Sequence, residues 1–175
     1  TDARNRQVTW SFDAAGRPLG RTLPDGQRET FQYDPAGQLI VHTGFGGQAT
    51  RYSYDSAGRP TSRVIAATAT APARTTTWTY TADGQRLTQT ETGATSSQGT
   101  TSYRYDANNL LIELASPQGT LAWAYHNEGR VTQRSTPEGT ARYQYDGDGR
   151  LATLTAPDGK TTTYGYDAAG RNTTS

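Results

Sequence analysis

The sequence contains no cysteine and no methionine, and it has only one lysine, Lys160, beside sixteen arginines. Without cysteine the chain forms neither disulfides nor thiolate metal sites, so its composition carries no information on redox compartment. The formal net charge of +1 argues against a nucleic-acid partner, which would need a basic stripe. No apolar run approaches the ~18 residues of a membrane-spanning helix, and no signal peptide opens the sequence.

Large aliphatic side chains are also scarce. Leu, Ile, Val and Phe together supply only 20 of the 175 residues, a share at which disorder becomes plausible. Disorder also favours a high net charge, which this chain does not have. The 17 aromatic residues decide the matter, because all but Phe45 fall on one regular register. The sequence therefore predicts an ordered fold with an aromatic core.

The register is that of an eight-residue motif: aromatic, any residue, aromatic, Asp, two small or polar residues, Gly and Arg. Its clearest copy is Tyr143–Arg150. The other copies are Trp10–Arg17, Phe31–Gln38, Tyr52–Arg59, Trp78–Gln85, Tyr103–Leu110, Trp123–Arg130 and Tyr164–Arg171. Successive copies follow at intervals of 20 to 26 residues, the signature of a repeat architecture. We expect residues 1–175 to form a single array of eight repeats, and the start and end of the chain beside repeat motifs suggest a fragment of a longer protein.

Each repeat is predicted to form a β-hairpin. Thr140 to Tyr145 alternates and is rich in Thr and Tyr, which favours a strand. Asp146 to Gly149 is typical of a turn, because Asp accepts bonds from backbone amides beyond it and Gly supplies a positive φ. Leu151 to Thr155 alternates again, which places Leu151, Thr153 and Thr155 on one face.

The junctions between repeats follow a few patterns. Four have the form Pro-x-Gly, read as type II turns with Gly in the left-handed position: Pro24–Gly26, Pro117–Gly119, Pro137–Gly139 and Pro157–Gly159. Gly44–Gly47 is expected to form a looser loop. Two longer junctions, Arg63–Thr77 and Thr88–Ser102, are rich in Ala, Thr and Ser, and are expected to form longer hairpin tips or surface loops.

The expected fold class is all-β, an array of β-hairpin repeats that forms a twisted or spiralling antiparallel sheet. The two aromatic residues of each motif point to the same face, where neighbouring repeats should stack their rings into a ladder. The other face should carry Thr, Arg, Gln and Ser. The motif Asp and Arg are expected to pair between neighbouring turns, and the open sheet edges to allow pairing with another copy.

Departures from the motif keep its turn chemistry. Asn109 replaces the Gly and tolerates a positive φ best among other residues, while Thr81 and His126 replace the Asp and still form hydrogen bonds. We predict the following structural repeat anchors: Phe12, Asp13, Gly16, Arg17, Tyr33, Asp34, Gly37, Tyr54, Asp55, Gly58, Arg59, Tyr80, Gly84, Tyr105, Asp106, Asn109, Tyr125, Gly129, Arg130, Tyr145, Asp146, Gly149, Arg150, Tyr166, Asp167, Gly170 and Arg171.

The motif resembles the tyrosine–aspartate (YD) repeat of the Rhs family, and the resemblance covers essentially the whole chain. That family includes bacterial polymorphic toxins, the cocoon-forming component of insecticidal toxin complexes, and teneurins. The resemblance implies a secreted or cell-surface protein and a segment of a shell wall, whose partners would be neighbouring YD repeats and an enclosed C-terminal toxin domain. Asp34-Pro35-Ala36-Gly37 resembles the family's Asp-Pro-x-Gly cleavage signature, but it lies in an ordinary repeat turn and is not assigned that role.

No catalytic, metal or cofactor site is predicted. His42 and His126 are interpreted as structural or solvent-facing, and most carboxylates belong to turns rather than to a glycosidase pair. Asp146–Gly149 resembles the start of a calcium loop but lacks the downstream Glu. The prediction is a non-enzymatic shell segment that encloses a toxin or effector cargo. The alternative is an extracellular carbohydrate-binding or adhesion module whose aromatic rows stack on a glycan.

Overall fold

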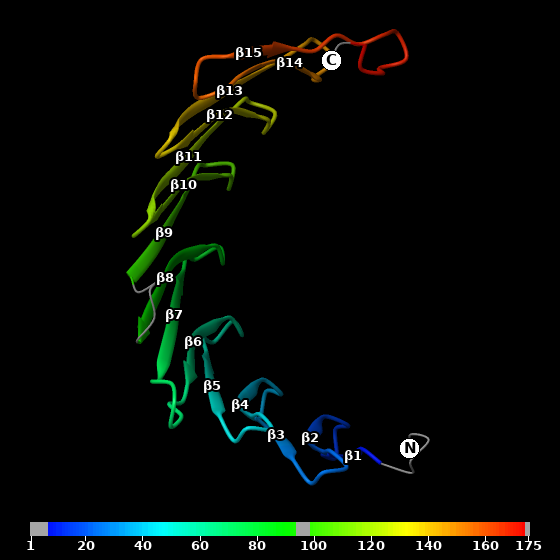
Figure 1. Cartoon of the computed structure of the whole chain (residues 1–175), viewed down its shortest axis with the longest axis vertical. Helices are drawn as coiled ribbons and strands as arrows, with labels where there is room; N and C mark the ends of the chain where they lie inside the picture. Colours follow the sequence, from blue (N-terminus) through cyan, green and yellow to red (C-terminus); the bar gives the residue numbers. More distant parts are fainter. Residues whose placement is uncertain (1–6, 94–98, 174–175) are drawn as a thin grey trace. The chain divides into compact units, whose positions relative to one another are not determined.

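A computed structural model describes residues 7–93 and 99–173, and within them all regular structure is β-strand. The strands are β1 (Thr9–Phe12), β2 (Pro18–Thr22), β3 (Arg28–Tyr33), β4 (Leu39–Thr43), β5 (Ala49–Tyr54), β6 (Pro60–Ile65), β7 (Arg74–Tyr80), β8 (Arg86–Gly93), β9 (Gly99–Tyr105), β10 (Leu111–Ser116), β11 (Gly119–Tyr125), β12 (Val131–Thr136), β13 (Gly139–Tyr145), β14 (Leu151–Thr155) and β15 (Thr161–Thr163). Their order in the sheet is their order in the chain (Figure 1). The predicted all-β antiparallel class is confirmed.

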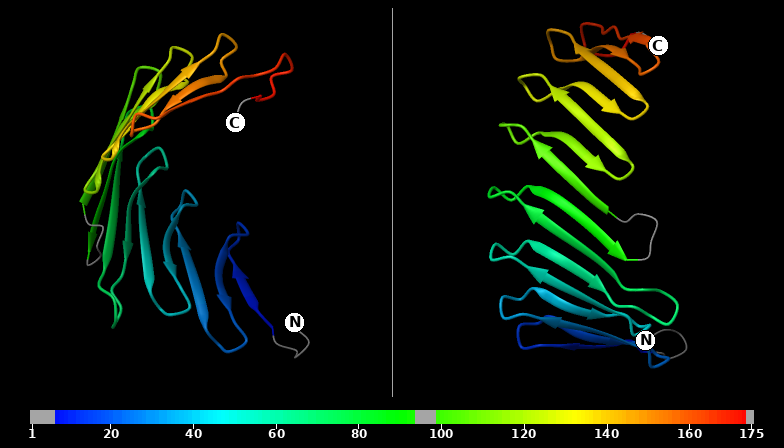
Figure 2. Two further views of the ribbon diagram at one scale, coloured as in Figure 1. Left: turned by 45° about the horizontal axis from the view of Figure 1, so that its top comes forward. Right: turned by 90° about the vertical axis from the view of Figure 1, so that its left-hand side faces the viewer.

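The chain divides into two compact units, Thr1–Thr100 and Thr101–Ser175. The first unit contains the hairpins β1–β2, β3–β4, β5–β6 and β7–β8. The second contains β11–β12 and β13–β14, together with β10 and most of β9. Each motif spans the turn of one hairpin, and Figure 2 shows these turns at one edge of each unit, with the inter-repeat junctions at the other edge. In the eighth repeat the short strand β15 precedes the motif, and Tyr166 of the motif forms an isolated bridge with Asn172.

The motif turn has the predicted chemistry. In the seventh repeat the Gly149 amide donates to the Asp146 carbonyl at 2.9 Å, and Gly149 has φ +79°. The Asp146 carboxylate accepts from the backbone amides of Asp148 and Arg150 at 3.0 and 2.9 Å. This is a type I turn followed by a left-handed residue, a common three-residue hairpin connection. Asn109, with φ +65°, is the one non-glycine residue of positive φ among the described residues, as its place in the motif predicted.

A β-bulge follows this turn in each of the seven full hairpins. In β13–β14, Tyr143 lies opposite Leu154, and the register then shifts so that Tyr145 lies opposite Leu151. The prediction that Leu151 shares a face with Thr153 and Thr155 is therefore wrong. One extra residue reverses the alternation of a strand, so the bulge brings Leu151 onto the face of the tyrosines.

The junction turns also differ from their prediction. The Gly26 amide donates to the Leu23 carbonyl at 2.9 Å and Gly26 has φ +86°, so this glycine is the fourth residue of its turn and not the third, as a type II turn requires. Gly47 bonds to Gly44 in the same way at 2.8 Å, so that junction is as tight as the others and not a looser loop. In the second unit, Gly119 and Gly139 instead follow two-residue loops, opposite Ser116 and Thr136.

The longer junctions extend the edge of the sheet opposite the motif turns. Residues 66–73 form a hairpin tip between β6 and β7, closed by the Thr68 amide on the Ala71 carbonyl at 2.7 Å, as predicted. Strand β7, which follows this tip, has 7 residues, and its neighbour β8 has 8 residues and is the longest strand described. The second long junction includes residues 94–98, which lie outside the described residues.

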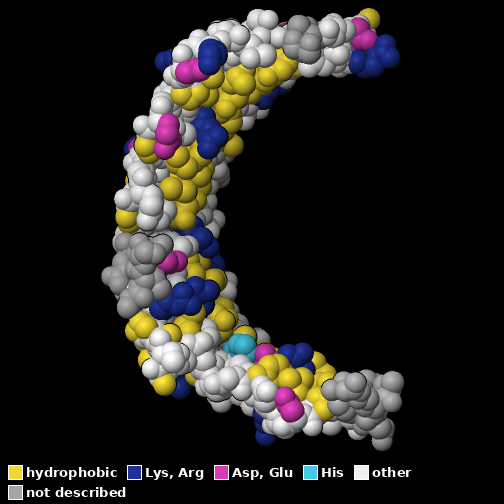
Figure 3. All heavy atoms as spheres, viewed as in Figure 1, with side chains coloured by type: hydrophobic (Ala, Val, Ile, Leu, Met, Phe, Trp, Pro, Cys, Tyr) yellow, Lys and Arg dark blue, Asp and Glu magenta, His cyan; other side chains and the backbone are white. Residues whose placement is uncertain are grey.

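The described residues contain no buried hydrophobic side chain, so the predicted aromatic core is wrong. A single sheet has no second layer to cover either face. The motif rings from Phe31 onward are half-buried on one face, and Trp10 and Phe12 remain 48% and 57% exposed. On the second unit, hydrophobic side chains form a nearly continuous band on one face (Figure 3). Each ring is therefore covered by its neighbours within the sheet and not by another layer.

A pair of glycine substitutions in one turn tests its backbone conformation. Gly47 has φ +76° and Gly44 does not have a left-handed φ, while both have open space where a Cβ would lie. We expect Gly47→Ala to lower the free energy of unfolding by about 1–2 kcal/mol, the cost of a left-handed L-residue. Gly44→Ala is the matched control and should change it by less than about 0.5 kcal/mol in urea unfolding. Equal effects of the two substitutions would contradict this account of the turn.

Candidate functional site

One face of the sheet, here called the aromatic face, carries both aromatic residues of each full hairpin. In the seventh repeat Tyr143 and Tyr145 share it with Leu154 and Leu151, which lie opposite them. The opposite face carries polar side chains, such as Gln144 across from Thr153. The predicted division into an aromatic and a polar face is confirmed. The aromatic rows are therefore a surface and not a core.

Where a motif has both the Asp and the Arg, the Asp binds the Arg of its own turn. The Arg Nε donates to the second carboxylate oxygen of the Asp four residues earlier, in the pairs Arg17–Asp13 at 2.6 Å, Arg59–Asp55 at 2.7 Å, Arg150–Asp146 at 2.8 Å and Arg171–Asp167 at 2.8 Å. The prediction that Asp and Arg pair between neighbouring turns is wrong. The contact within the turn instead fixes where the guanidinium points.

The guanidinium of a motif Arg lies over the second aromatic ring of the following repeat. The Arg Cζ atom is 4.8 Å from the ring centroid in Arg17–Tyr33, Arg59–Tyr80 and Arg150–Tyr166, and 5.6 Å in Arg130–Tyr145. These four are all the motif arginines that have a following repeat in the sequence. We call the chain of contacts from Asp through Arg to the next tyrosine the Asp–Arg–Tyr bridge; it links consecutive repeats.

The spacing of strands explains why the predicted ladder of stacked rings is wrong. Each repeat adds two strands, so equivalent rings lie about 9.5 Å apart, whereas stacked rings need about 4.5–7 Å between centroids. The ring–ring contacts among the described residues are Trp10 with Phe12, and Phe31 with His42. A guanidinium whose Cζ lies 4.8 Å from the ring centroid spans about half of the distance between equivalent rings. The equivalent ring of the next repeat is too far away to make such a contact.

The tyrosine hydroxyl makes a second link between repeats. It donates to the first carbonyl of the preceding hairpin's second strand, in Tyr54–Leu39, Tyr80–Pro60, Tyr125–Leu111, Tyr145–Val131 and Tyr166–Leu151, at 2.7 to 2.9 Å. The ladder between β14 and β15 begins only at Thr153, so Leu151 lies beyond its end. The hydroxyl thus gives a partner to a carbonyl that the backbone ladder leaves out.

Close packing of the bridge gives the motif glycine a second role. A Cβ on Gly37 would lie 3.1 Å from Nη1 of Arg17, and a Cβ on Gly84 would lie 3.5 Å from Nη1 of Arg59. The guanidinium of one turn therefore passes directly over the glycine of the next turn. Arg59 also donates from Nη1 to the Thr81 carbonyl at 3.1 Å, within that next turn.

Hydrogen bonds lower the pKa of the motif carboxyls. For Asp13, Asp55 and Asp146 the backbone amide of the Arg four residues on is the largest cause of the lowered pKa, and the guanidinium of that Arg adds to it. The pKa of Asp167 is lowered by the same two groups of Arg171. These carboxylates are thus charged turn-forming groups, the opposite of a raised-pKa acid suited to proton donation at neutral pH.

Three repeats lack the Arg, and after two of them the hydroxyl link is kept. Gln38 stands before Tyr54, and Leu110 before Tyr125, yet both tyrosines still donate to the preceding hairpin. Burial raises the pKa of Tyr54 and of Tyr125, with smaller contributions from nearby acidic groups. The hydroxyl bond therefore forms with or without the guanidinium.

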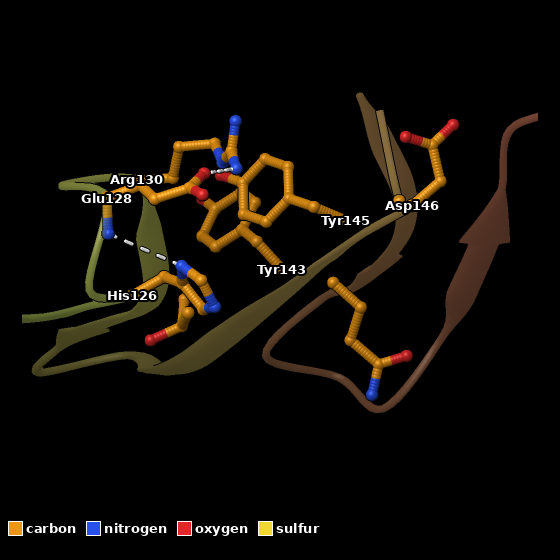
Figure 4. Close-up of a pocket in the computed structure, with 9 residues that line it drawn as sticks. His126, Glu128, Arg130, Tyr143, Tyr145 and Asp146 are labelled. Atoms are coloured by element: carbon orange, nitrogen blue, oxygen red, sulfur yellow. Dashed lines mark hydrogen bonds and ion pairs between the residues drawn. The ribbon is translucent and has the colours of Figure 1, made fainter. Parts of the chain in front are cut away.

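The sixth repeat is the irregular one. His126 replaces the Asp and accepts from the Glu128 amide through Nδ1 at 3.4 Å, so it keeps part of the turn chemistry as predicted. Arg130 instead pairs with the Glu128 carboxylate, and its Nε, buried, has no hydrogen-bond partner. An open hollow of about 450 Å³ lies here, between this turn and β13 (Figure 4). Arg130 lies beside Tyr145 in it, while Asp146 points away (Figure 4).

A polar cluster on the aromatic face of the first unit was missed by sequence reasoning. Glu29 binds Arg21 at 2.9 Å and His42 Nε2 at 2.8 Å, and His42 stacks on Phe31. The His42 hydrogen bond and the Arg21 charge lower the pKa of Glu29. Arg21 lies opposite Trp10 and His42 opposite Phe31. The signal in the sequence was the type of residue that lies opposite the first aromatic of a motif, here Arg21 and His42. Those opposite residues can be identified only when the register of the bulged hairpin is known.

The described residues hold no group of three or more His, Asp or Glu side chains placed to bind a metal ion. Within the same residues, the structure has no helix long and apolar enough to span a bilayer. Among the described residues, the hydrogen bond of the His126 ring in this hollow is the one with the backbone amide of Glu128. The site, as the described residues show it, is a set of repeated contacts between side chains of neighbouring repeats.

The predicted anchors occupy corresponding places in the seven full hairpins. The second aromatics end the first strand of each full hairpin, the Asp and Gly open and close the turn, and the Arg follows the turn. The structure brings Arg17, Arg59, Arg130 and Arg150 onto the tyrosine of the next repeat. Among the described residues it brings no guanidinium over Phe12 and no ring to Arg171. The anchors thus meet between repeats, and not only within one turn.

Comparison with known families agrees with this repeated geometry. The RHS repeat family matches residues 1–28, 12–49, 33–71, 105–141, 125–161 and 145–174. The chain belongs to the RHS repeat family. The unmatched stretch, residues 72–104, contains β7 and β8, the end of the first long junction and the whole of the second. No curated protein sequence matches the chain.

Solved structures with a similar fold include two crystal structures of TcdB2–TccC3. The crystal structure of TcdB2–TccC3–TEV has a TM-score of 0.69 at 16% identity, over 97% of this chain and 10% of that one. The structure of TcdB2–TccC3 without its hypervariable C-terminal region has a TM-score of 0.50 at 15% identity, over 94% of this chain and 11% of that one. Identities this low show the fold alone. The RHS chain spans about a tenth of the length of these neighbours.

Removing one hydroxyl tests the link between repeats. Tyr80→Phe leaves the ring under Arg59 but removes the donor to the Pro60 carbonyl. We expect it to lower the free energy of unfolding by about 0.5–1.5 kcal/mol, the net value of one hydrogen bond. Tyr52→Phe is the matched control, because the described structure gives the Tyr52 hydroxyl no hydrogen bond. Urea unfolding that shows equal losses for both variants would contradict the role of the link.

Acidification tests the charged turns. The lowered pKa of Asp146 means that its carboxylate stabilises the fold above the unfolded pKa of about 3.9, and that this stability is lost as pH falls through the lower folded pKa. Asp146→Asn should therefore be less stable than the wild type at neutral pH, and the difference should shrink below about pH 4. Asp83→Asn, in the exposed part of the fourth turn, is the control. A difference that grows on acidification would contradict this sign.

Proposed function

We propose that this RHS-repeat chain is a non-catalytic structural segment in the wall of a shell that encloses a toxin or another effector. Its eight repeats would act as one array over residues 1–175, and the predicted anchors would hold that array together. The observation that carries the proposal is the Asp–Arg–Tyr bridge, by which the first, third and seventh repeats each contact the next repeat within the sheet. Membership in the RHS repeat family and the fold shared with TcdB2–TccC3 support it.

The mechanism would be exclusion. Within each unit, neighbouring strands are joined along a hydrogen-bonded ladder, and the turns are closed by their own side chains. Such a ladder pairs most backbone groups of the described interior strands, and tyrosine hydroxyls bond to carbonyls at the strand ends. It has one polar face and one half-buried aromatic face, so it would separate two environments of different character.

The partners of the chain would be the repeats before and after it in a longer protein, and an enclosed C-terminal toxin domain. Both follow from the resemblance of the motif to Rhs proteins. On the same basis we propose that the protein acts as a secreted or cell-surface component. No cofactor enters the mechanism, because exclusion needs only the continuity of the sheet.

A carbohydrate-binding or adhesion role is the second candidate, and one observation favours it. The hollow of the sixth and seventh repeats combines the half-buried rings of Tyr143 and Tyr145 with polar groups of His126 and Arg130. Small-molecule sites in proteins combine aromatic side chains with a few polar groups in this way. Tyr145 is also the ring over which Arg130 lies between repeats, which is the reason we place this role second.

Two measurements, one on the full-length protein and one on this chain, separate these functions. Electron microscopy of the full-length gene product that carries this sequence should show a closed, hollow particle with this sheet in its wall. Oligosaccharide titrations that follow tryptophan fluorescence of the chain should show no saturable change. An open or extended particle would overturn the shell. Saturable quenching that is lost in a triple variant of Trp10, Trp78 and Trp123, with the fold intact by circular dichroism, would establish the binding module instead.

A further inference from the structure

The hairpin tip between β6 and β7 differs in composition from the strands beside it. Residues 66–73 read Ala-Ala-Thr-Ala-Thr-Ala-Pro-Ala, without a charged or aromatic side chain. Every residue from Ala67 to Arg74 is exposed, and Figure 2 shows the tip as a loop beyond the ends of the two strands. The tip connects two paired strands inside the first unit, so its exposure does not depend on where the chain begins or ends.

The tip presents two side-chain hydroxyl groups, and they differ in their hydrogen bonds. Thr68 Oγ1 accepts from the backbone amides of Thr70 and Ala71 at 3.3 and 3.0 Å, so it belongs to the turn that closes the tip. Among the described residues, the Thr70 hydroxyl contacts Thr68 Oγ1 at 3.4 Å, longer than an ordinary O–H···O bond of about 2.7–2.8 Å. The Thr70 hydroxyl is therefore the one that can react without opening the turn.

The threonines of the strands are less accessible to an enzyme. Thr77 is exposed on the polar face of β7, but it is paired on both sides, with Ser62 and with Thr90. The Thr79 hydroxyl bonds to that of Thr88 at 2.7 Å. An enzyme that modifies a side chain takes the surrounding peptide into a cleft, and a paired strand cannot enter one without losing its ladder. An exposed loop tip meets this requirement.

The sequence of the tip and its accessibility point to the same modification. Segments that are rich in Ser or Thr and contain Pro are typical of O-glycosylated chains, and Pro72 lies two residues after Thr70. We propose that Thr70 is an O-glycosylation site. Its Oγ1 forms a bond to the anomeric carbon of a sugar that is activated as a diphosphate ester. The bond from that carbon to the phosphate oxygen breaks, the diphosphate leaves with the electron pair, and the hydroxyl proton passes to a base of the transferase.

A sugar at this position would shield the tip without disturbing the sheet. Exposed tips of small residues are preferred sites of proteolytic nicking. The contact between Arg59 and Tyr80 lies at the other end of β7, so a group attached to Thr70 leaves it unchanged. The inference goes beyond the shell function and rests on the tip alone.

Peptide mass spectrometry of the full-length protein, purified from the cells that naturally produce it, tests the site. Trypsin releases Val64–Arg74, in which Thr68 and Thr70 carry the side-chain hydroxyls, and the adjacent peptide Thr75–Arg86, which has five threonines, most of them in β7. We expect most copies of the first peptide to carry the added mass of a hexose or an N-acetylhexosamine, and the second peptide to carry none. Electron-transfer fragmentation should place the added mass on Thr70.

Variants made in the same cells complete the test. Thr70→Ala should abolish the added mass, Thr70→Ser should retain it because it keeps a hydroxyl, and the control Thr77→Ala should leave it unchanged. The proposal is overturned if Val64–Arg74 is unmodified, if the sugar lies on Thr68, or if both peptides are modified alike. It is also overturned if the added group is a phosphate, which would indicate a kinase site. Each of these results leaves the shell proposal standing, since that proposal is tested by the shape of the particle.

Discussion

The contact between an arginine and the tyrosine of the next repeat depends on a spacing that the chain cannot alter. Two strands per repeat set a translation of about 9.5 Å, too far for ring to meet ring and close enough for a guanidinium to lie between them. Arg150 reaches Tyr166 because Asp146 holds its Nε, and Asp146 is itself held by the turn. The motif therefore combines a turn, a positioned cation and a receiving ring in eight residues.

The consequence for stability is a sheet that holds together through neighbours alone. Among the described residues no apolar side chain is buried, so no central core exists to make distant repeats cooperate. In such arrays the total stability is close to a sum of the stability of each repeat and of its interfaces. The hydroxyl link and the bridge are two separate interface contributions, because Tyr54 and Tyr125 keep the first without the second. Loss of one motif residue is thus a local event, which explains the variation among the eight copies.

The period, the hairpins, the Asp and Gly of the turn, and the left-handed Asn109 could be predicted from the sequence, because each depends on residues close together in the chain. The face of Leu151 could not, since a single bulged residue reverses strand alternation without changing the pattern of residue types. The Arg–Tyr stacking also escaped prediction, because it depends on the distance between strands and not on distance along the chain. Of the candidate site, only the contacts within the motif turn could be predicted. Arg21, Glu29 and His42 lie on different strands and meet because of a strand register that the sequence does not reveal.

The motif turns and the junctions between repeats lie at opposite edges of the sheet in each unit, and only the junctions vary in length. The tip at residues 66–73 adds its residues to the ends of β6 and β7, far along the strand from Arg59 and Tyr80, whose contact is unchanged at 4.8 Å. The edge that carries the junctions can thus accept inserted peptide without disturbing the phase of the array. In an evolving lineage or in the laboratory, that edge is where new epitopes or processing sequences could be grafted while the wall keeps its geometry.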